Sequence, residues 1–143
     1  MKKLLFSLIL TTLVSTGLKA LPQLPNYGQT ISSTPWKVVT ENSVVSIKYG
    51  YKIHKTPKVN HRYLVLHVIN KTNQEITVTF TKKMWYNGNE VIPDDHKITL
   101  TIPANSHIEG DVNGIDRSLL IFSENFGSVV MGKLTNYEIN IIN

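Results

Sequence analysis

The sequence predicts an all-β protein, an antiparallel β-sandwich of seven or eight strands. Three observations lead to this prediction. Apolar and polar residues alternate along several short stretches, turn-forming residues separate these stretches at close spacing, and no long stretch has the 3.6-residue period of a helix. A parallel α/β arrangement is disfavoured, because its crossover connections need helices.

The strictest alternation runs over residues 45–53. Apolar residues fill one side of this stretch, and the other side holds Ser46, Lys48, Gly50 and Lys52. Because successive side chains of a strand point to opposite faces, the pattern predicts a half-buried strand with its lysines in water. Residues 63–69 are apolar on both faces, which is typical of a central strand. Shorter stretches predict further strands over residues 76–80, 98–102, 119–122 and 137–141.

Turn-forming residues stand between these predicted strands. The strongest signal is Asn87-Gly88, because both residue types tolerate the positive φ of a tight hairpin turn. Further turns are expected over residues 70–73, 103–106 and 113–114.

The first twenty residues have the pattern of a secretory signal peptide. Two lysines precede an apolar run that ends near Val14, and small residues then lead to Ala20. The run is shorter than the about 20 apolar residues that cross a bilayer. We therefore expect an exported protein that is periplasmic, on the outer surface or secreted; cleavage near Gly17 and retention as an anchor are the alternatives. Residues 21–35 predict a flexible lead-in, and residues 36–143 the sandwich domain.

Charge and cysteine content exclude several classes of protein. Lys2, Lys3 and Lys19 lie in the predicted signal, so the mature chain keeps a net charge of 12 − 10 = +2. A nearly neutral domain lacks the charge footprint of a nucleic-acid binder. The chain has no cysteine, so its stability rests on the core without disulfides, and thiol catalysis is excluded. We expect no membrane span after removal of the signal.

Three stretches resemble the core of many exported immunoglobulin-like sandwich domains. They are residues 63–72 (YLVLHVINKT), residues 76–79 (ITVT) and residues 102–106 (IPANS). The chain is similar to small uncharacterised secreted proteins of Bacteroidetes-type bacteria. This resemblance implies an immunoglobulin-like sandwich and carries no catalytic residues.

Sequence motifs of several common enzyme chemistries are missing from the chain. It has no glycine-rich phosphate or dinucleotide loop, no His-Glu-x-x-His zinc motif and no Gly-x-Ser-x-Gly nucleophile turn. We therefore expect no enzyme, no catalytic residue and no cofactor, although a dispersed catalytic triad would need no local motif.

Three histidines are weak candidates for a metal site. His54 and His61 flank a short loop and would meet if the strands on either side pair, and His67 follows on the second strand. Imidazole groups bind Zn²⁺ and Cu²⁺. Lys55, Lys58 and Arg62 surround this loop and would repel a cation, so no metal is expected.

The aromatic residues before the Asn87-Gly88 turn are the candidate binding residues. Trp85 and Tyr86 are neighbours on a predicted strand, so one of them should point outward beside Asn87. Exposed aromatic residues near loops often mark binding surfaces. The alternative is that Trp85 fills the core and Tyr86 covers its rim.

Two function classes follow from these observations. The first is a non-catalytic binding or structural module of the cell envelope or extracellular space, with an unidentified protein or glycan as partner. The second is a small-ligand or metal binder that uses the loop between His54 and His61.

Overall fold

The computed structural model describes residues 30–32, 35–114, 117–126 and 132–142. The predicted signal peptide, residues 1–20, lies outside the described residues, as does most of the predicted lead-in. All regular structure in the described part is β-strand, which confirms the all-β prediction. No helix in that part is long and apolar enough to cross a membrane.

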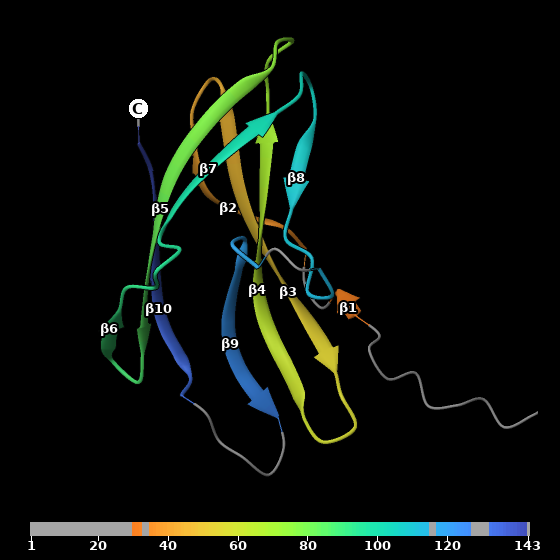
Figure 1. The fold of residues 1–143 in the computed structure, drawn as a ribbon, viewed down its shortest axis with the longest axis vertical. Coiled ribbons are helices and arrows are strands. Elements are labelled where there is room, and N and C mark those ends of the chain that lie inside the picture. The colour runs from red at the N-terminus through yellow and green to blue at the C-terminus, as the bar shows by residue number, and fades with distance from the viewer. Residues whose placement is uncertain (1–29, 33–34, 115–116, 127–131, 143) are drawn as a thin grey trace, which may run out of the picture.

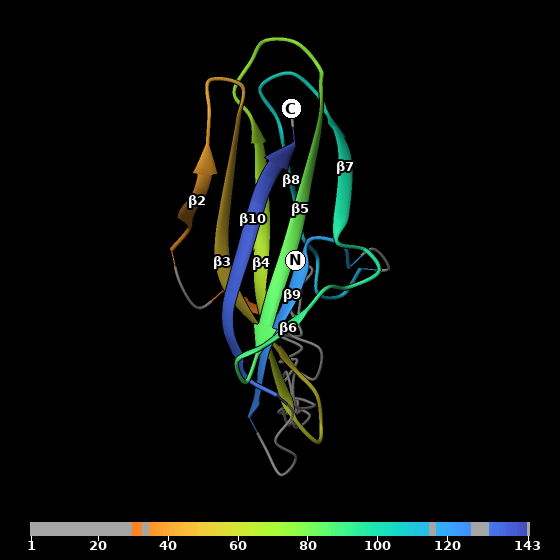
Figure 2. The same cartoon turned by 90° about the vertical axis from the view of Figure 1, so that its left-hand side faces the viewer.

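The strands form two antiparallel sheets that pack face to face (Figures 1 and 2). We call the six-stranded sheet, with the long strands β3 and β4 in its middle, sheet A, and the four-stranded sheet around β5 sheet B. Sheet A consists of β1 (Thr30–Ser32), β2 (Lys37–Glu41), β3 (Val45–Lys55), β4 (Asn60–Asn70), β8 (His107–Glu109) and β9 (Leu120–Phe126). Sheet B consists of β5 (Ile76–Tyr86), β6 (Asn89–Val91), β7 (Lys97–Ile102) and β10 (Leu134–Ile142).

The structure has ten strands in its described part, so the prediction of seven or eight was too low. Three of the ten, β1, β6 and β8, are only three residues long. An alternation of period two cannot be recognised over so few residues. One of these strands, β1, lies within the segment 21–35 that was expected to be a flexible lead-in.

The main core fills the space between the two sheets. Sheet A contributes the inward side chains of β3, β4 and β9, and sheet B those of β5, β7 and β10. Both sides therefore follow the period-two pattern of the sequence. The least exposed of the core residues are Ile47, Leu64, Leu66, Val68, Phe80 and Ile102.

One lysine interrupts the apolar inner face of sheet B. Lys82 lies between Phe80 and Met84 on that face and is only 1% exposed. Its Nζ donates hydrogen bonds of 2.7 Å to Asp95 Oδ2 and to the backbone carbonyl of Ser118. The buried cation is thus paired, and it joins the β6–β7 connection to the segment that precedes β9.

A second apolar cluster covers the outer face of sheet A. Val65, Val112 and Leu120 are buried there, and Trp36 and Tyr63 pack against them. The ring of Trp36 lies over Gly50 of β3, where a Cβ would stand 3.1 Å from its Cε3. This face was expected in water, but Gly50 and Ser46 are buried and Lys48 and Lys52 are half-buried. Lys52 forms an ion pair with Glu109 of β8.

Candidate functional site

The β5–β6 hairpin forms the tight turn that the sequence predicts. Tyr86 pairs with Asn89, which leaves Asn87 and Gly88 as the two turn residues. Their φ angles are 52° and 84°, both in the left-handed region that a type I′ turn requires. The hairpin therefore has a defined backbone conformation.

Hydrogen bonds to β10 and the residue before it hold this turn in place. Asn87 exchanges two bonds with Lys133: its backbone N–H donates to the carbonyl of Lys133 at 3.0 Å, and its Oδ1 accepts from the N–H of Lys133 at 3.1 Å. The hydroxyl of Thr135 accepts from Gly88 N at 3.1 Å and donates to the carbonyl of Trp85 at 3.0 Å. Asn87 is thus a structural anchor of the turn as well as a candidate binding residue.

The two neighbouring aromatic residues face opposite sides of sheet B. Tyr86 packs against the main core, and its hydroxyl donates a 2.6 Å hydrogen bond to the carbonyl of Phe122. Burial raises the pKa of the Tyr86 phenol to about 12. Its hydroxyl is therefore committed to the interior of the sandwich.

Trp85 lies on the outer face of sheet B, because it stands between Met84 and Tyr86, which both face the core. The alternative in which Trp85 fills the core is thereby wrong. Trp85 is half-buried, and its cross-strand neighbours are Glu90 of β6 and Asn136 of β10. Glu90 lies 3.8 Å from the ammonium group of Lys83.

Farther along β5, the outer face of sheet B carries a row of hydroxyl groups. Thr77 and Thr79 of β5 lie opposite Thr101 and Thr99 of β7, with Oγ1–Oγ1 distances of 3.3 and 3.0 Å. No described segment packs over this face to form an apolar cluster of the kind found on sheet A. Trp85 is thus a single large ring beside the amide of Asn136 and the paired charges of Lys83 and Glu90, and Thr79, the nearest of these threonines, lies six residues away along β5.

The three candidate metal-binding histidines do not come together. His54 of β3 is directly paired with His61 of β4, as expected if these strands pair. His67 lies six residues farther along β4, about 20 Å away at the usual rise of a strand. Among the described residues, no three histidine or carboxylate side chains are grouped so that they could hold a metal ion.

The two histidines of this pair have different surroundings. His61 Nδ1 lies 2.7 Å from Asn125 Oδ1 of β9, within hydrogen-bond distance. His54 Nδ1 is buried and has no hydrogen-bond partner. The pair therefore offers nitrogen ligands from two adjacent strands, without a carboxylate.

His67 belongs to a different cluster, on the outer face of sheet A. Its ring stacks on His107 of β8 with a centroid distance of 4.5 Å and meets Trp36 edge-on at 4.7 Å. Its Nδ1 is 3.4 Å from Glu109 Oε2 but makes no hydrogen bond. Burial lowers the pKa of His67, with a smaller contribution from His107, while Glu109 opposes the shift.

No local pattern in the sequence predicts this cluster. Trp36 precedes β2, His67 lies in β4, and His107 and Glu109 lie in β8. The pairing of β4 with β8 brings His67 next to Glu109 and His107, which are far apart from it in the sequence.

Comparison with known proteins adds no assignment, because no family model, no curated protein and no solved structure matches the chain. The resemblance to Bacteroidetes-type sandwich proteins therefore stays a prediction.

Proposed function

We propose that this chain is an exported, non-catalytic binding module that meets its partner at the outer face of sheet B around Trp85. The observation that carries this proposal is the outward position of Trp85 beside a hydrogen-bonded hairpin turn. A large ring on a fixed backbone loses little conformational entropy when a ligand packs on it.

A glycan is the partner class that this surface favours. Close to Trp85 lie the hydroxyl of Thr135, the amide of Asn136 and the ion pair of Lys83 with Glu90. The threonine pairs lie farther along the same outer face. Sugar rings stack on aromatic side chains through their apolar faces and use their hydroxyls for hydrogen bonds. A protein interface would instead be expected to show an apolar centre of several residues.

The immunoglobulin-like class is part of the same proposal. Its support is the return of β9 and β10 to pair with β4 and β5, a long connection of the Greek-key kind. The connectivity would be a variant, since the consecutive strands β2, β3 and β4 share one sheet. In immunoglobulin constant domains the second and third strands lie in different sheets.

The two tryptophans allow a direct test of the binding surface. Trp36 lies on sheet A and Trp85 on sheet B, so Trp36→Phe leaves Trp85 as the single fluorescent indole. A panel of soluble oligosaccharides and peptidoglycan fragments should change the emission of this variant. The reciprocal variant, Trp85→Phe, should show weaker binding and no change in emission.

Tyr86→Phe is the matched control, because it removes only the hydroxyl that bonds inside the sandwich. It should bind like the parent protein at temperatures where both are folded. Binding that survives in Trp85→Ala at full strength would contradict the proposal. If Trp85 mediates binding to a protein and no glycan changes its emission, the proposed surface is retained but the partner is a protein and not a glycan.

A metal or small-ligand site at the β3–β4 hairpin is the second candidate. It is supported by the direct pairing of His54 with His61 and by the unpartnered Nδ1 of His54. Titration with Zn²⁺ or Cu²⁺ should then raise the melting temperature, and His54→Gln should abolish this rise. An unchanged melting temperature in the parent protein would eliminate this candidate.

A further inference from the structure

The free edge of sheet B is formed by β10. This strand pairs with β5 on one side, and no described strand pairs with its other side (Figure 2). It is nine residues long and contains no lysine, arginine or proline. A long edge of this kind presents unpaired backbone N–H and C=O groups to any strand that fits.

Other strands at the sheet edges carry features that oppose such pairing. β2 is five residues long, begins with Lys37 and has a register shift against β3. β9 contains Glu124 and has a register shift against β4. β7 begins with Lys97, and β1, β6 and β8 are three residues long. β10 also contains a glutamate, Glu138, and a register shift against β5, but it is the longest edge strand in the described part of the chain.

An apolar groove of about 210 Å³ lies beside the end of β10. Two of its rim residues, Val44 and Ile142, are 40% and 43% exposed. No charged residue lines it. The lining residues are Asn42, Val44, Val45, Ile76, Thr77, Val78, Ile141 and Ile142.

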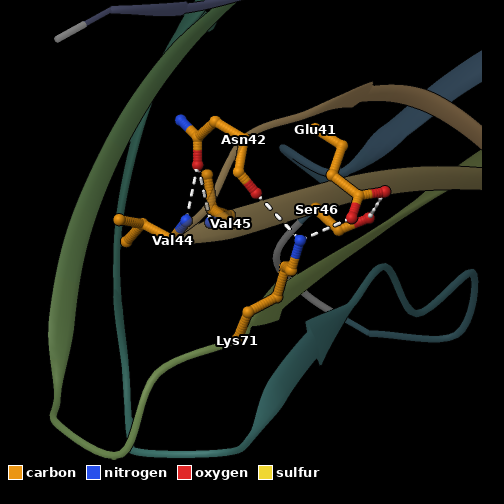
Figure 3. A network of polar contacts seen from close by, with 6 residues as sticks. All are labelled: Glu41, Asn42, Val44, Val45, Ser46 and Lys71. Atoms are coloured by element: carbon orange, nitrogen blue, oxygen red, sulfur yellow. Dashed lines mark hydrogen bonds and ion pairs between the residues drawn. The ribbon is translucent and has the colours of Figure 1, made fainter.

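One wall of this groove is fixed by the polar network that Figure 3 shows. Asn42 Oδ1 accepts 2.8 Å hydrogen bonds from the N–H groups of Val44 and Val45 (Figure 3). Lys71 donates from Nζ to Glu41 Oε1 at 2.5 Å and to the carbonyl of Asn42 at 2.9 Å. The β2–β3 turn is therefore held in place, and the exposed Val44 is part of a preformed surface.

We propose that β10 is a homodimer interface in which two copies pair their β10 strands antiparallel about a two-fold axis at Ile139. A register irregularity between Leu134 and Asn136 interrupts the strand, so its regular part is Asn136–Ile142. The midpoint of that part is Ile139. Antiparallel edge pairing of identical strands gives a closed, isologous dimer.

This register is self-complementary in both polarity and charge. It sets Tyr137 opposite Ile141 of the second copy, and these two residues and Ile139 all pack against the core within one copy. It also sets Glu138 opposite Asn140, whose amide already donates a 2.8 Å hydrogen bond to Glu138 within the chain. A register centred on Glu138 would instead oppose two like charges, which destabilises a strand pair.

The dimer also accounts for the apolar groove. In the proposed register the amino-terminal end of one β10 lies beside Ile142 of the other, next to the groove. Pairing would bring the second strand against Ile142, one of the exposed rim residues, in both copies. Since the axis runs perpendicular to the joined sheet, both Trp85 side chains would lie on the same surface.

Sedimentation analysis between micromolar and millimolar protein tests the proposal, with Asn140→Glu as the main variant. Asn140 is exposed, so the change should leave the fold intact. It sets a second carboxylate opposite Glu138 twice in the dimer and should weaken association about tenfold. The double variant Glu138→Lys, Asn140→Glu restores opposite charges across the axis and should recover the dimer.

Thr101→Glu is the matched control, because it adds the same charge at an exposed position of β7, on the other side of sheet B. It should leave the association constant unchanged. A protein that stays monomeric at all concentrations overturns the proposal. Association that responds to Thr101→Glu but not to Asn140→Glu overturns it too, and failure of the double variant to recover overturns the register.

Hydrogen exchange of the parent protein gives a second measurement that needs no variant. The outward amides of residues 136–142 should become more protected as the protein concentration rises, while amides of β7 should not change. Protection that is independent of concentration would overturn the β10 interface.

Discussion

The outer faces of the two sheets differ in what covers them. On sheet A, Trp36 lies over Gly50, and Val112 and Leu120 complete a buried cluster around Val65. On sheet B the corresponding surface carries paired threonines and the half-buried Trp85. The covered face contributes to stability as a second small core, and the uncovered face is available to a partner. The same residue type, tryptophan, therefore serves packing on one sheet and is the candidate binding group on the other.

The largest expected difference between the faces comes from single outward side chains. Leu120→Ala on sheet A should cost about 2–5 kcal/mol, because it opens a cavity in the second cluster. Thr99→Ala, at an exposed position of the outer face of sheet B, should cost about 0.5 kcal/mol or less, as for a surface site. Denaturant unfolding measures both values, and equal costs would show that the two faces do not differ in burial energy.

Removal of the tryptophan on sheet A should also cost more unfolding free energy than removal of the one on sheet B, but the difference should be smaller. We expect Trp36→Ala to lower the unfolding free energy by about 2–3 kcal/mol, since its ring packs on Gly50, Val65 and His67. Trp85→Ala should lower it by about 1 kcal/mol. Thermal and denaturant unfolding provide the comparison. A larger loss of unfolding free energy for Trp85→Ala would show that Trp85 stabilises the fold and would contradict its assignment to the binding surface.

The contact between Trp36 and Gly50 can be tested from the glycine side. Gly50→Ala brings a Cβ to 3.1 Å from the Trp36 ring, and overpacking of this kind costs about 1–3 kcal/mol. The same change made in the Trp36→Ala background should cost much less, because the opposing ring is gone. An undiminished cost in the double variant would show that the ring does not cause the penalty.

The smallest effect is expected from pH, and only on the sheet A face. The pKa of His67 is lowered in the folded protein, chiefly by burial, so the unfolded chain binds more protons. Stability should therefore fall as the pH drops below about 6.5, the usual pKa of histidine, and level off below the lowered folded value.

His67→Phe should flatten this pH profile, as measured by denaturant unfolding between pH 5 and 8 (roughly the range in which histidine titrates). His96→Gln, in the exposed β6–β7 connection, is the control and should leave the slope as it is in the parent. A profile that keeps its slope in His67→Phe would assign the pH dependence to another group.

Local chain features were predictable from the sequence alone. Asn87 and Gly88 take positive φ angles in a two-residue turn, as their residue types require. The inner face of β3 follows the alternation of residues 45–53. In the predicted strand over residues 98–102, Ile98 and Ile102 lie in the core, as the alternation there requires. Leu100 is half-buried, so its removal should cost less than that of a fully buried leucine.

The sequence by itself determined the strand class, the absence of disulfides and the main hairpin turn, because these depend on residue type and on a period of two within one segment. Only the tertiary structure decided which outer face is covered, which aromatic ring turns inward and where the histidines meet. Trp36 and Val112 reach Val65 from distant parts of the chain, and His67 meets His107 through the pairing of β4 with β8. The burial of Lys82 likewise depends on Asp95 and Ser118, which no local pattern connects to it. Contacts between distant segments are set by how the sheets pack. The pattern of a single strand contains no information about which segment packs over its outer face.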